Sequence, residues 1–277
     1  VKNGNGRKAI VIGAGPAGLT AADLLAQRGF DVSLYEKNNN AGGQISLAAA
    51  PPDKAKTGWF TEDATASCLE HGVKIHTGKE LSVKEIKEIA PAVVILATGS
   101  KPVKPHFEGN YNPDELYTFE DILSGKVCIE NERVAVIGSG MTGLETAHYL
   151  TENGNKVTVI EMASELAPGT WMQHKDDIIP KLNQAGTVFM TGEKLAAIRN
   201  GYVVTENVRS GVATSIEIDK VVLALGSKPV NELEGLLKSF LAENNPLRTV
   251  IHEQFFKSQF LRIIRSRHTD NRRNAVR

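Results

Sequence analysis

Two glycine-rich stretches of the chain could bind a phosphate-bearing ligand. Each follows a short run of β-branched residues, precedes a helical pattern and keeps the spacing Gly-x-Gly-x-x-Gly. In that context the first glycine permits a tight turn, the second lets the backbone approach a pyrophosphate, and the third allows close helix–strand packing. The helix N-terminus then offers free N–H donors to the anion. The glycines are Gly13, Gly15 and Gly18 in the first stretch and Gly138, Gly140 and Gly143 in the second.

A carboxylate follows each stretch at the same distance. Glu36 and Glu161 close the next apolar strand, and each lies 23 positions after the first glycine of its copy. A glutamate at this position accepts hydrogen bonds from the hydroxyls of an adenosine ribose. Glu161 would also repel a 2′-phosphate, and the residues after it, Met162 to Ser164, offer no cation, which favours NADH over NADPH. The alternative is that the glycines merely make turns and both glutamates are solvated.

Further landmarks repeat in the same order. Thr77-Gly78-Lys-Glu-Leu81 matches Thr191-Gly192-Glu-Lys-Leu195, and Ala97-Thr-Gly99-Ser-Lys-Pro-Val103 matches Ala224-Leu-Gly226-Ser-Lys-Pro-Val230. Internal similarity of this kind indicates duplicated structural units. The chain therefore contains two copies of one α/β unit.

The elements that must position these residues follow from hydrophobic periodicity. Apolar runs at 9–12, 93–96, 134–137, 157–160 and 221–223 predict strands buried in parallel sheets, and 16–28 and 141–153 predict helices that end before a glycine. The predicted fold class is α/β, with two tandem Rossmann-like dinucleotide-binding domains and parallel sheets. The predicted boundaries are 1–105 for the first domain, 106–228 for the second and 229–277 for an atypical or truncated return to the first. Residues 101–125 are expected to connect the two units.

Composition excludes several classes of protein. The 277 residues are 41% hydrophobic and 23% charged with a formal net charge of zero, so no overall field attracts nucleic acid. No apolar run approaches the roughly 18 residues of a membrane helix. The two cysteines, Cys68 and Cys128, form no Cys-x-x-Cys and are expected to be buried structural thiols in a cytoplasmic protein. The histidines show no metal-ligand spacing, and His148 and His174 are expected on helix faces, so no metal site is predicted.

The sequence resembles two-dinucleotide flavoproteins, and most closely the C-terminal half of the NADH:flavin oxidoreductases related to old yellow enzyme. That group includes 2-enoate reductase, 2,4-dienoyl-CoA reductase and trimethylamine dehydrogenase, and its fold is like that of pyridine nucleotide-disulfide oxidoreductases without the redox disulfide. The similarity covers roughly 7–236. The motifs are Gly13-Ala-Gly-Pro-Ala-Gly18, Tyr35-Glu-Lys37, Gly42-Gly-Gln44, Ala97-Thr-Gly-Ser100, Val159-Ile-Glu-Met162 and, for the enoate-reductase branch, the stretch from Glu161 to Trp171.

The resemblance implies one cofactor for each unit. The FAD site on the first unit would comprise Gly13, Gly15, Pro16, Ala17, Gly18, Glu36, Lys37, Gly43, Gln44, Leu81, Ala97, Thr98 and Gly99. The NADH site on the second unit would comprise Gly138, Ser139, Gly140, Met141, Thr142, Gly143, Glu145, Glu161 and Gly226.

The implied reaction is hydride transfer from NADH to FAD, in which the cofactors carry the chemistry and the protein positions them. The catalytic residues are therefore left unknown, with no proton donor named. Glu145 would lie near the nicotinamide, or would be a carboxylate on the helix surface. Trp171 and Met172 could flank the nicotinamide, but core packing is the favoured interpretation.

Two departures from the family pattern leave alternatives open. Full-length members carry an N-terminal barrel with FMN and an iron–sulfur cluster, which this chain lacks, so a partner domain or subunit is expected and the chain is interpreted as a fragment. Family members hold the ribitol of FAD with the aspartate of a Gly-Asp pair, and the sequence after Leu236 contains no such pair. The stretch from Val250 to Phe255 resembles the family's last helix. The basic residues from Arg262 to Arg277 predict a solvated tail or, less favoured, a nucleic-acid patch.

Three functions remain at this point. The first is the electron-input half of an enoate or dienoyl-CoA reductase-like enzyme. The second is a non-catalytic remnant that binds ADP or NAD. The third is a stand-alone reductase of a small protein partner. Neither nucleic acid nor a membrane is an expected partner.

Overall fold

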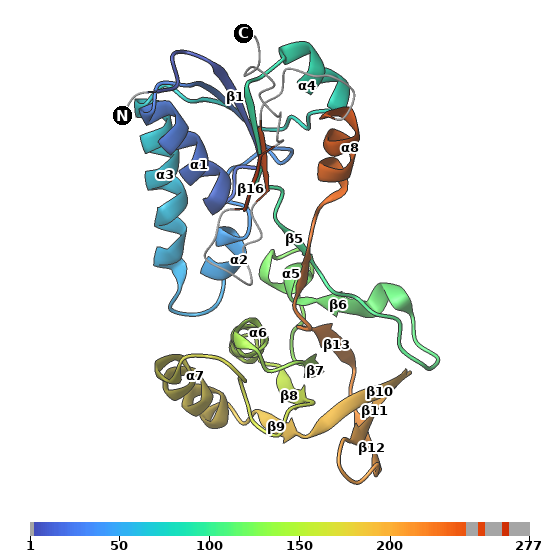
Figure 1. Cartoon of the computed structure of the whole chain (residues 1–277). Coiled ribbons are helices and arrows are strands. Elements are labelled where there is room, and N and C mark those ends of the chain that lie inside the picture. Colours follow the sequence, from blue (N-terminus) through green and yellow to red (C-terminus); the bar gives the residue numbers. More distant parts are fainter. Residues whose placement is uncertain (1–2, 242–248, 253–261, 266–277) are drawn as a thin grey trace, which may run out of the picture. The chain divides into compact units, whose positions relative to one another are not determined.

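The computed structural model describes residues 3–241, 249–252 and 262–265. Packing divides the chain into two compact units (Figure 1). The first unit consists of Val1–Ile45, Gly58–Gly99 and Pro229–Arg277, and the second consists of Ser46–Thr57 and Ser100–Lys228. The assignment of one cofactor to each predicted domain stays a prediction.

The first unit is built on a mainly parallel sheet. Among the described residues its strand order is β16-β15-β4-β1-β2-β3, with all neighbours parallel except β15 and β16. Its elements are β1 (Lys8–Ile12), α1 (Pro16–Gln27), β2 (Asp31–Tyr35), α3 (Trp59–Glu70), β3 (Lys74–His76), α4 (Val83–Ile89), β4 (Val93–Leu96), α8 (Glu232–Leu241), β15 (Thr249–His252) and β16 (Arg262–Arg265).

Helices cover both faces of this sheet because its strands are apolar on both faces. Val11 of β1 belongs to a buried cluster with Leu19 of α1 and Cys68 of α3. The neighbouring Ile10 points to the opposite face and belongs to a cluster with Ile86 of α4 and Leu237 of α8. Figure 1 accordingly shows α1 and α3 on one side of β1 and α4 and α8 on the other.

The second unit holds a five-stranded parallel sheet of order β6-β13-β7-β8-β9 and an antiparallel sheet of order β10-β11-β12 in its described residues. A short pair, β14-β5, accompanies them. Its elements are α2 (Ile45–Ala49), η1 (Ala55–Gly58), β5 (Ser100–Pro102), η2 (Pro113–Glu115), β6 (Leu116–Thr118), α5 (Phe119–Leu123), β7 (Arg133–Ile137), α6 (Met141–Glu152), β8 (Lys156–Glu161), α7 (Met172–Gln184), β9 (Val188–Thr191), β10 (Glu193–Arg199), β11 (Tyr202–Asn207), β12 (Ala213–Glu217), β13 (Lys220–Leu223) and β14 (Ser227–Pro229).

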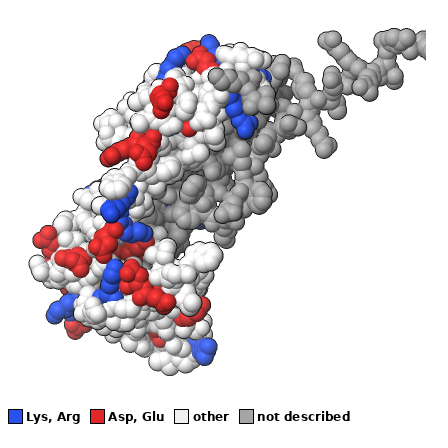
Figure 2. All heavy atoms as spheres, turned by 90° about the vertical axis from the view of Figure 1, so that its left-hand side faces the viewer, with Lys and Arg blue, Asp and Glu red and all other residues white. Residues whose placement is uncertain are grey.

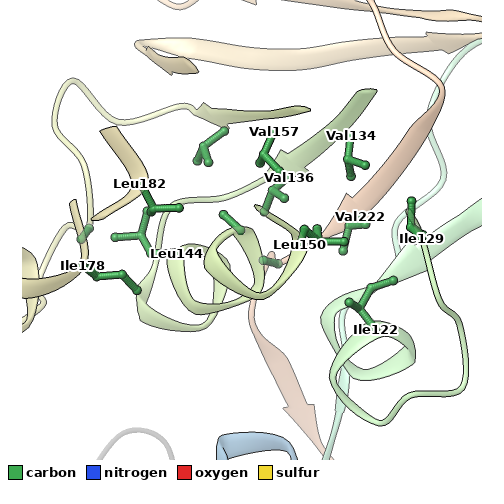
Figure 3. Packing of buried hydrophobic residues seen from close by; sticks show 14 residues of the cluster. Ile122, Ile129, Val134, Val136, Leu144, Leu150, Val157, Ile178, Leu182 and Val222 are labelled. Carbon is green, nitrogen blue, oxygen red and sulfur yellow. The ribbon is translucent and has the colours of Figure 1, made fainter. Parts of the chain in front are cut away.

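Two cores fill the faces of the parallel sheet of the second unit. On one face Val134 and Val136 of β7 pack with Leu144 of α6 and Leu182 of α7 (Figure 3). On the other face Ile137 packs with residues of the antiparallel sheet, among them Leu195 and Val203. The unit is therefore layered as helices, parallel sheet and antiparallel sheet, and the central helix α6 begins where β7 ends.

The predicted α/β fold class is confirmed. The five predicted strands lie within β1, β4, β7, β8 and β13, and helices α1 and α6 each end one residue earlier than expected. Residues 101–125 were expected only to connect the units, but they contain β5, η2, β6 and α5, and β6 pairs with β13. A strand of three residues shows no periodicity of its own, and its pairing partner lies about a hundred positions away.

Two expectations for the chain outside the glycine motifs are wrong. Cys68 is buried as expected, but Cys128 is exposed. The stretch from Val250 to Phe255 resembles the family's last helix, but Val250–His252 belong to strand β15 and pair in parallel with β4, whereas residues 253–255 lie outside the described residues. Of the predicted basic tail, only β16 is described.

Charges of both signs are interspersed among uncharged side chains on the face shown in Figure 2. None of the described helices combines the length and apolar character that crossing a bilayer requires.

The contact between α6 and β7 generates a stability prediction. A Cβ atom on Gly143 would lie 2.0 Å from the carbonyl oxygen of Gly138, whereas a Cβ on Gly140 meets no described atom within 4 Å. We expect Gly143→Ala to lower the free energy of unfolding by about 3 kcal/mol, because backbone must move to accommodate the methyl group. The matched variant Gly140→Ala should cost less than about 1 kcal/mol. Chemical denaturation followed by circular dichroism measures both, and equal losses would contradict the packing.

Candidate functional site

The first glycine turn joins β1 to α1, and two of its glycines are required by the protein itself. Gly13 has a φ of 102°, and a Cβ there would lie 2.1 Å from the carbonyl oxygen of Ala97. A Cβ on Gly18 would lie 1.8 Å from the carbonyl oxygen of Gly13. Both contacts are too short for any side chain, so the helix can begin this close to the strand only if both residues are glycine.

The middle glycine of the turn is different. Gly15 has a φ of −75°, which any residue adopts, and a Cβ there would meet no described atom within 4 Å. Nothing in the described fold therefore requires glycine at this position. The space beside Gly15 is instead open to a ligand that approaches the backbone closely.

The second turn, between β7 and α6, repeats this arrangement. Gly138 has a φ of 101° and lies against the carbonyl oxygen of Ala224, and Gly143 lies against Gly138. Gly140 again has an ordinary φ, −56°, and open space where a Cβ would stand. Each turn therefore exposes the backbone of its middle glycine, and the packing of the described residues does not explain why glycine stands there.

Both turns also present an uncompensated helix N-terminus. Gly15 and Gly140 are the N-cap residues of α1 and α6; neither helix has a side-chain cap or an acidic residue in its described first turn. Pro16 occupies the first helical position of α1, where an N–H is not needed. The first N–H groups and the positive end of each helix dipole are thus available to an anion.

A carboxylate lies beside each turn. Glu36, only 6% exposed, accepts hydrogen bonds from the backbone N–H of Ala14 (2.8 Å) and of Asn38 (2.9 Å). Glu161 accepts from the N–H of Ser139 (2.7 Å) and of Ala163 (2.8 Å) in the same way. These bonds orient both carboxylates next to the glycine turns, where a ribose attached to a bound pyrophosphate would lie.

The glycine pair after β2 approaches the first turn, where the family resemblance implies that Gly43 and Gln44 line the FAD site. The N–H of Gly42 donates to the carbonyl oxygen of Ala14 (2.8 Å). Gly43 has a φ of 53°, and a Cβ there would lie 3.0 Å from the Cα of Gly15. Gly43 and the adjacent Gln44 are thereby held beside the open backbone of Gly15. Lys37 is exposed on the same loop.

The ends of β4 and β13 complete the two turns. The N–H of Ala97 donates to Ile12, and that of Ala224 donates to Ile137, each at 2.8 Å. The Thr98 hydroxyl donates to the carbonyl oxygen of Val230 (2.8 Å). Gly99 and Gly226 both adopt positive φ just after these strands. Ala224 was not predicted as a site residue, although its match to Ala97 in the repeat would have indicated it.

Leu81 is placed differently from the residues around the turns. Its side chain is buried in a cluster with Ile10 and Leu96. Any contact of Leu81 with a ligand would therefore involve its backbone. Of the remaining predicted residues, Ala17 lies in the first turn of α1, and Met141 and Thr142 lie in the first turn of α6.

Glu145 occupies the second turn of α6 and forms an ion pair with Lys54. Glu145 is only 7% exposed, so its interpretation as a helix-surface carboxylate is wrong. Lys54 reaches Glu145 from the segment Ser46–Thr57, which packs with the second unit. No local pattern predicts this contact between residues 91 positions apart.

The two bulky residues at the start of α7 do not pack in a core. Trp171 is 77% exposed and Met172 is 70% exposed, so the favoured interpretation of core packing is wrong. A place beside the nicotinamide stays a prediction for both. His148 lies on α6 and His174 on α7, as expected for helix-face residues.

Neither described cysteine has the environment of a reactive thiolate. Burial raises the pKa of the Cys68 thiol to about 11, and its Sγ donates to the carbonyl oxygen of Leu19. The exposed Cys128 also has a raised pKa, because its thiol hydrogen-bonds to Glu130. Within the described residues, no three His, Cys, Asp or Glu side chains gather as metal ligands would.

Comparisons with known proteins extend these observations. The family model described as pyridine nucleotide-disulphide oxidoreductase matches residues 7–252. An NADH oxidase of Thermoanaerobacter brockii is 40% identical over 244 residues, which cover 84% of this chain and 36% of the relative. A cinnamate reductase of Clostridium sporogenes is 31% identical over 228 residues, covering 79% of this chain and 33% of the relative.

A solved structure of 2-naphthoyl-CoA reductase with 2-naphthoyl-CoA superposes with a TM-score of 0.76 at 29% identity, covering 83% of this chain and 34% of that one. The chain thus spans about a third of the length of the relatives it matches. The resemblance to the FAD- and NADH-binding half of the group related to old yellow enzyme is confirmed. Members of the matched family are flavin-dependent oxidoreductases that use FAD and NAD(H). Because the family model covers most of its residues, this chain belongs to the pyridine nucleotide-disulphide oxidoreductase family.

Proposed function

We propose that the first unit binds FAD, that the second binds NADH, and that the chain is the electron-input half of an enoate or dienoyl-CoA reductase-like enzyme. Hydride passing from the nicotinamide to the flavin is the chemistry that the two cofactors supply when bound. The similarity to a cinnamate reductase and to a 2-naphthoyl-CoA reductase supports an unsaturated acid or thioester as the final acceptor.

The observation that carries the proposal is the open backbone at Gly15 and Gly140. Both positions lack a described neighbour that would exclude a side chain, and both have a φ that any residue adopts. A pyrophosphate in contact with the backbone and with the first N–H groups of the helix explains why glycine stands there. The residues present therefore fit two dinucleotides.

The protein's own residues then bind and orient. Glu36 and Glu161 would accept hydrogen bonds from the two adenosine riboses, and the negative charge of Glu161 favours NADH over NADPH. Gly43 and Gln44 would line the FAD site. Glu145, buried in α6 and paired with Lys54, would stabilise the positive charge that the nicotinamide ring gains on giving up hydride.

A partner supplies the substrate site in this proposal. The relatives are about three times longer than the matched region, which covers 36% of the NADH oxidase and 34% of the 2-naphthoyl-CoA reductase. A barrel domain or subunit with FMN and an iron–sulfur cluster would accept electrons from the FAD of this chain and pass them to the substrate.

The cofactor assignment is tested with the matched variants Gly15→Ala and Gly140→Ala. The purified chain is incubated with excess FAD and desalted, its absorption spectrum is recorded, and NADH is added without oxygen. The parent chain should keep its flavin peaks and bleach with NADH. Because the added methyl group displaces a pyrophosphate by contact, Gly15→Ala should lose FAD, whereas Gly140→Ala should keep FAD and need at least about tenfold more NADH.

Each contrary result is specific. A parent chain that is colourless after desalting would exclude the FAD assignment and indicate a remnant that binds only ADP or NAD. Exchanged effects, in which Gly15→Ala weakens NADH and Gly140→Ala loses flavin, would reverse the two sites.

The role of Glu145 is tested by Glu145→Gln. Removing the charge should slow flavin reduction by saturating NADH about tenfold or more, because the developing positive charge loses its counter-charge. Glu152, exposed at the end of the same helix, supplies the control Glu152→Gln, which should leave the rate unchanged. Anaerobic stopped-flow absorbance measures the rate, and equal rates in both variants would remove Glu145 from the reaction.

A further inference from the structure

We infer that the hydroxyl group of Ser139 blocks one acceptor position of Glu161, so that the second unit holds an adenosine ribose through one carboxylate oxygen where the first unit uses two. This inference rests on the proposed function, in which the nucleotide of the second unit is NADH. Ser139 would then be the residue that lets the second unit release its nucleotide after each turnover, whereas the first unit keeps its nucleotide bound.

The internal repeat provides the comparison. Ala14 and Ser139 occupy the same place, directly after the first glycine of each turn. Each donates its backbone N–H to the glutamate of its own unit, at 2.8 Å to Glu36 and at 2.7 Å to Glu161. Only Ser139 adds a side-chain donor, because its Oγ lies 2.8 Å from the same oxygen, Oε2, of Glu161.

The count of acceptor positions follows from these bonds. A carboxylate offers about four lone-pair positions, two on each oxygen. Among the described residues, Glu36 uses one on Oε2 for Ala14 and one on Oε1 for Asn38, which leaves one on each oxygen. Glu161 uses both positions of Oε2 for Ser139 and one of Oε1 for Ala163, which leaves a single position on Oε1.

The direction of the hydroxyl proton is set by a further contact. The backbone N–H of Ala167 donates to the Oγ of Ser139 at 3.0 Å, so this oxygen already acts as an acceptor. Ser139 and Ala167 are both 0% exposed, so water does not compete for the hydroxyl group. Its proton therefore points to Glu161, the acceptor that the described structure provides.

The two glutamates consequently suit different ligands. Glu36 can accept from the 2′- and the 3′-hydroxyl of a ribose together, as suits a cofactor that stays bound. Glu161 can accept from one of them, which makes dissociation easier, and NADH must leave after each turnover. The expected difference is about three- to tenfold in affinity, the usual worth of one hydrogen bond.

The test uses ADP-ribose as the probe, with its 2′-deoxy- and 3′-deoxyadenosine counterparts, titrated calorimetrically into the full chain loaded with FAD, so that the first unit is already occupied. In the parent chain only one of the two deoxy compounds should bind at least about threefold more weakly than ADP-ribose. In Ser139→Ala both should do so, and ADP-ribose itself should bind three- to tenfold more tightly. Ser139→Thr keeps a hydroxyl group and should restore the parent pattern.

A purely structural role for Ser139 gives a different result. If losing the acceptor for Ala167 only loosens the turn, all three probes weaken equally and the two deoxy penalties stay as in the parent chain, which would overturn the inference. The converse variant Ala14→Ser tests the inference even if Ser139→Ala folds poorly. It should lower the affinity for FAD three- to tenfold, and an unchanged FAD affinity would count against the inference. Failure of the parent chain to bind ADP-ribose at all would instead reject the proposed function.

Discussion

The contact between the first and third glycines of each turn determines where everything else at the sites lies. Gly18 rests on the carbonyl oxygen of Gly13, and Gly143 rests on that of Gly138, at separations that no side chain tolerates. Helix and strand meet there backbone to backbone. This contact directs the helix N-terminus past the strand end and leaves the middle glycine bare. It also brings the amide N–H after the first glycine within reach of the glutamate on the neighbouring strand.

Because this backbone arrangement is used twice, the differences between the copies are informative. The first unit surrounds its turn with a glycine pair, Gly42-Gly43, and with a glutamate that is nearly buried. The second unit has a serine after its first glycine, exposed bulky residues at Trp171 and Met172, and the pair Glu145–Lys54. Duplication conserved the part that packing demands, and the copies diverged at the positions where a ligand would touch side chains.

The sequence allowed prediction of the parts that repeat locally. The strand–turn–helix units and both glutamates follow from spacing within about 40 residues, since neighbouring elements of such a unit pack together, whereas the place of Gly43 was implied only by the family resemblance. Features set by distant contacts were not predictable. The Lys54–Glu145 pair, strand β6 beside β13 and strand β15 beside β4 each join segments that show no pattern of their own. Bulky apolar residues are usually buried, so the sequence favours a core position for Trp171, whereas the structure leaves this N-cap residue of α7 77% exposed.

The order of segments along the chain has a consequence for biosynthesis. The first unit is discontinuous, because its sheet needs β15 beside β4 while residues 100–228 between them build the other unit. On a ribosome the inserted unit can complete both of its sheets while the outer one still lacks an edge of its sheet. The first unit therefore stays incomplete longest. A nucleotide that reached it early would meet the first glycine turn and Glu36 before the sheet around them was complete.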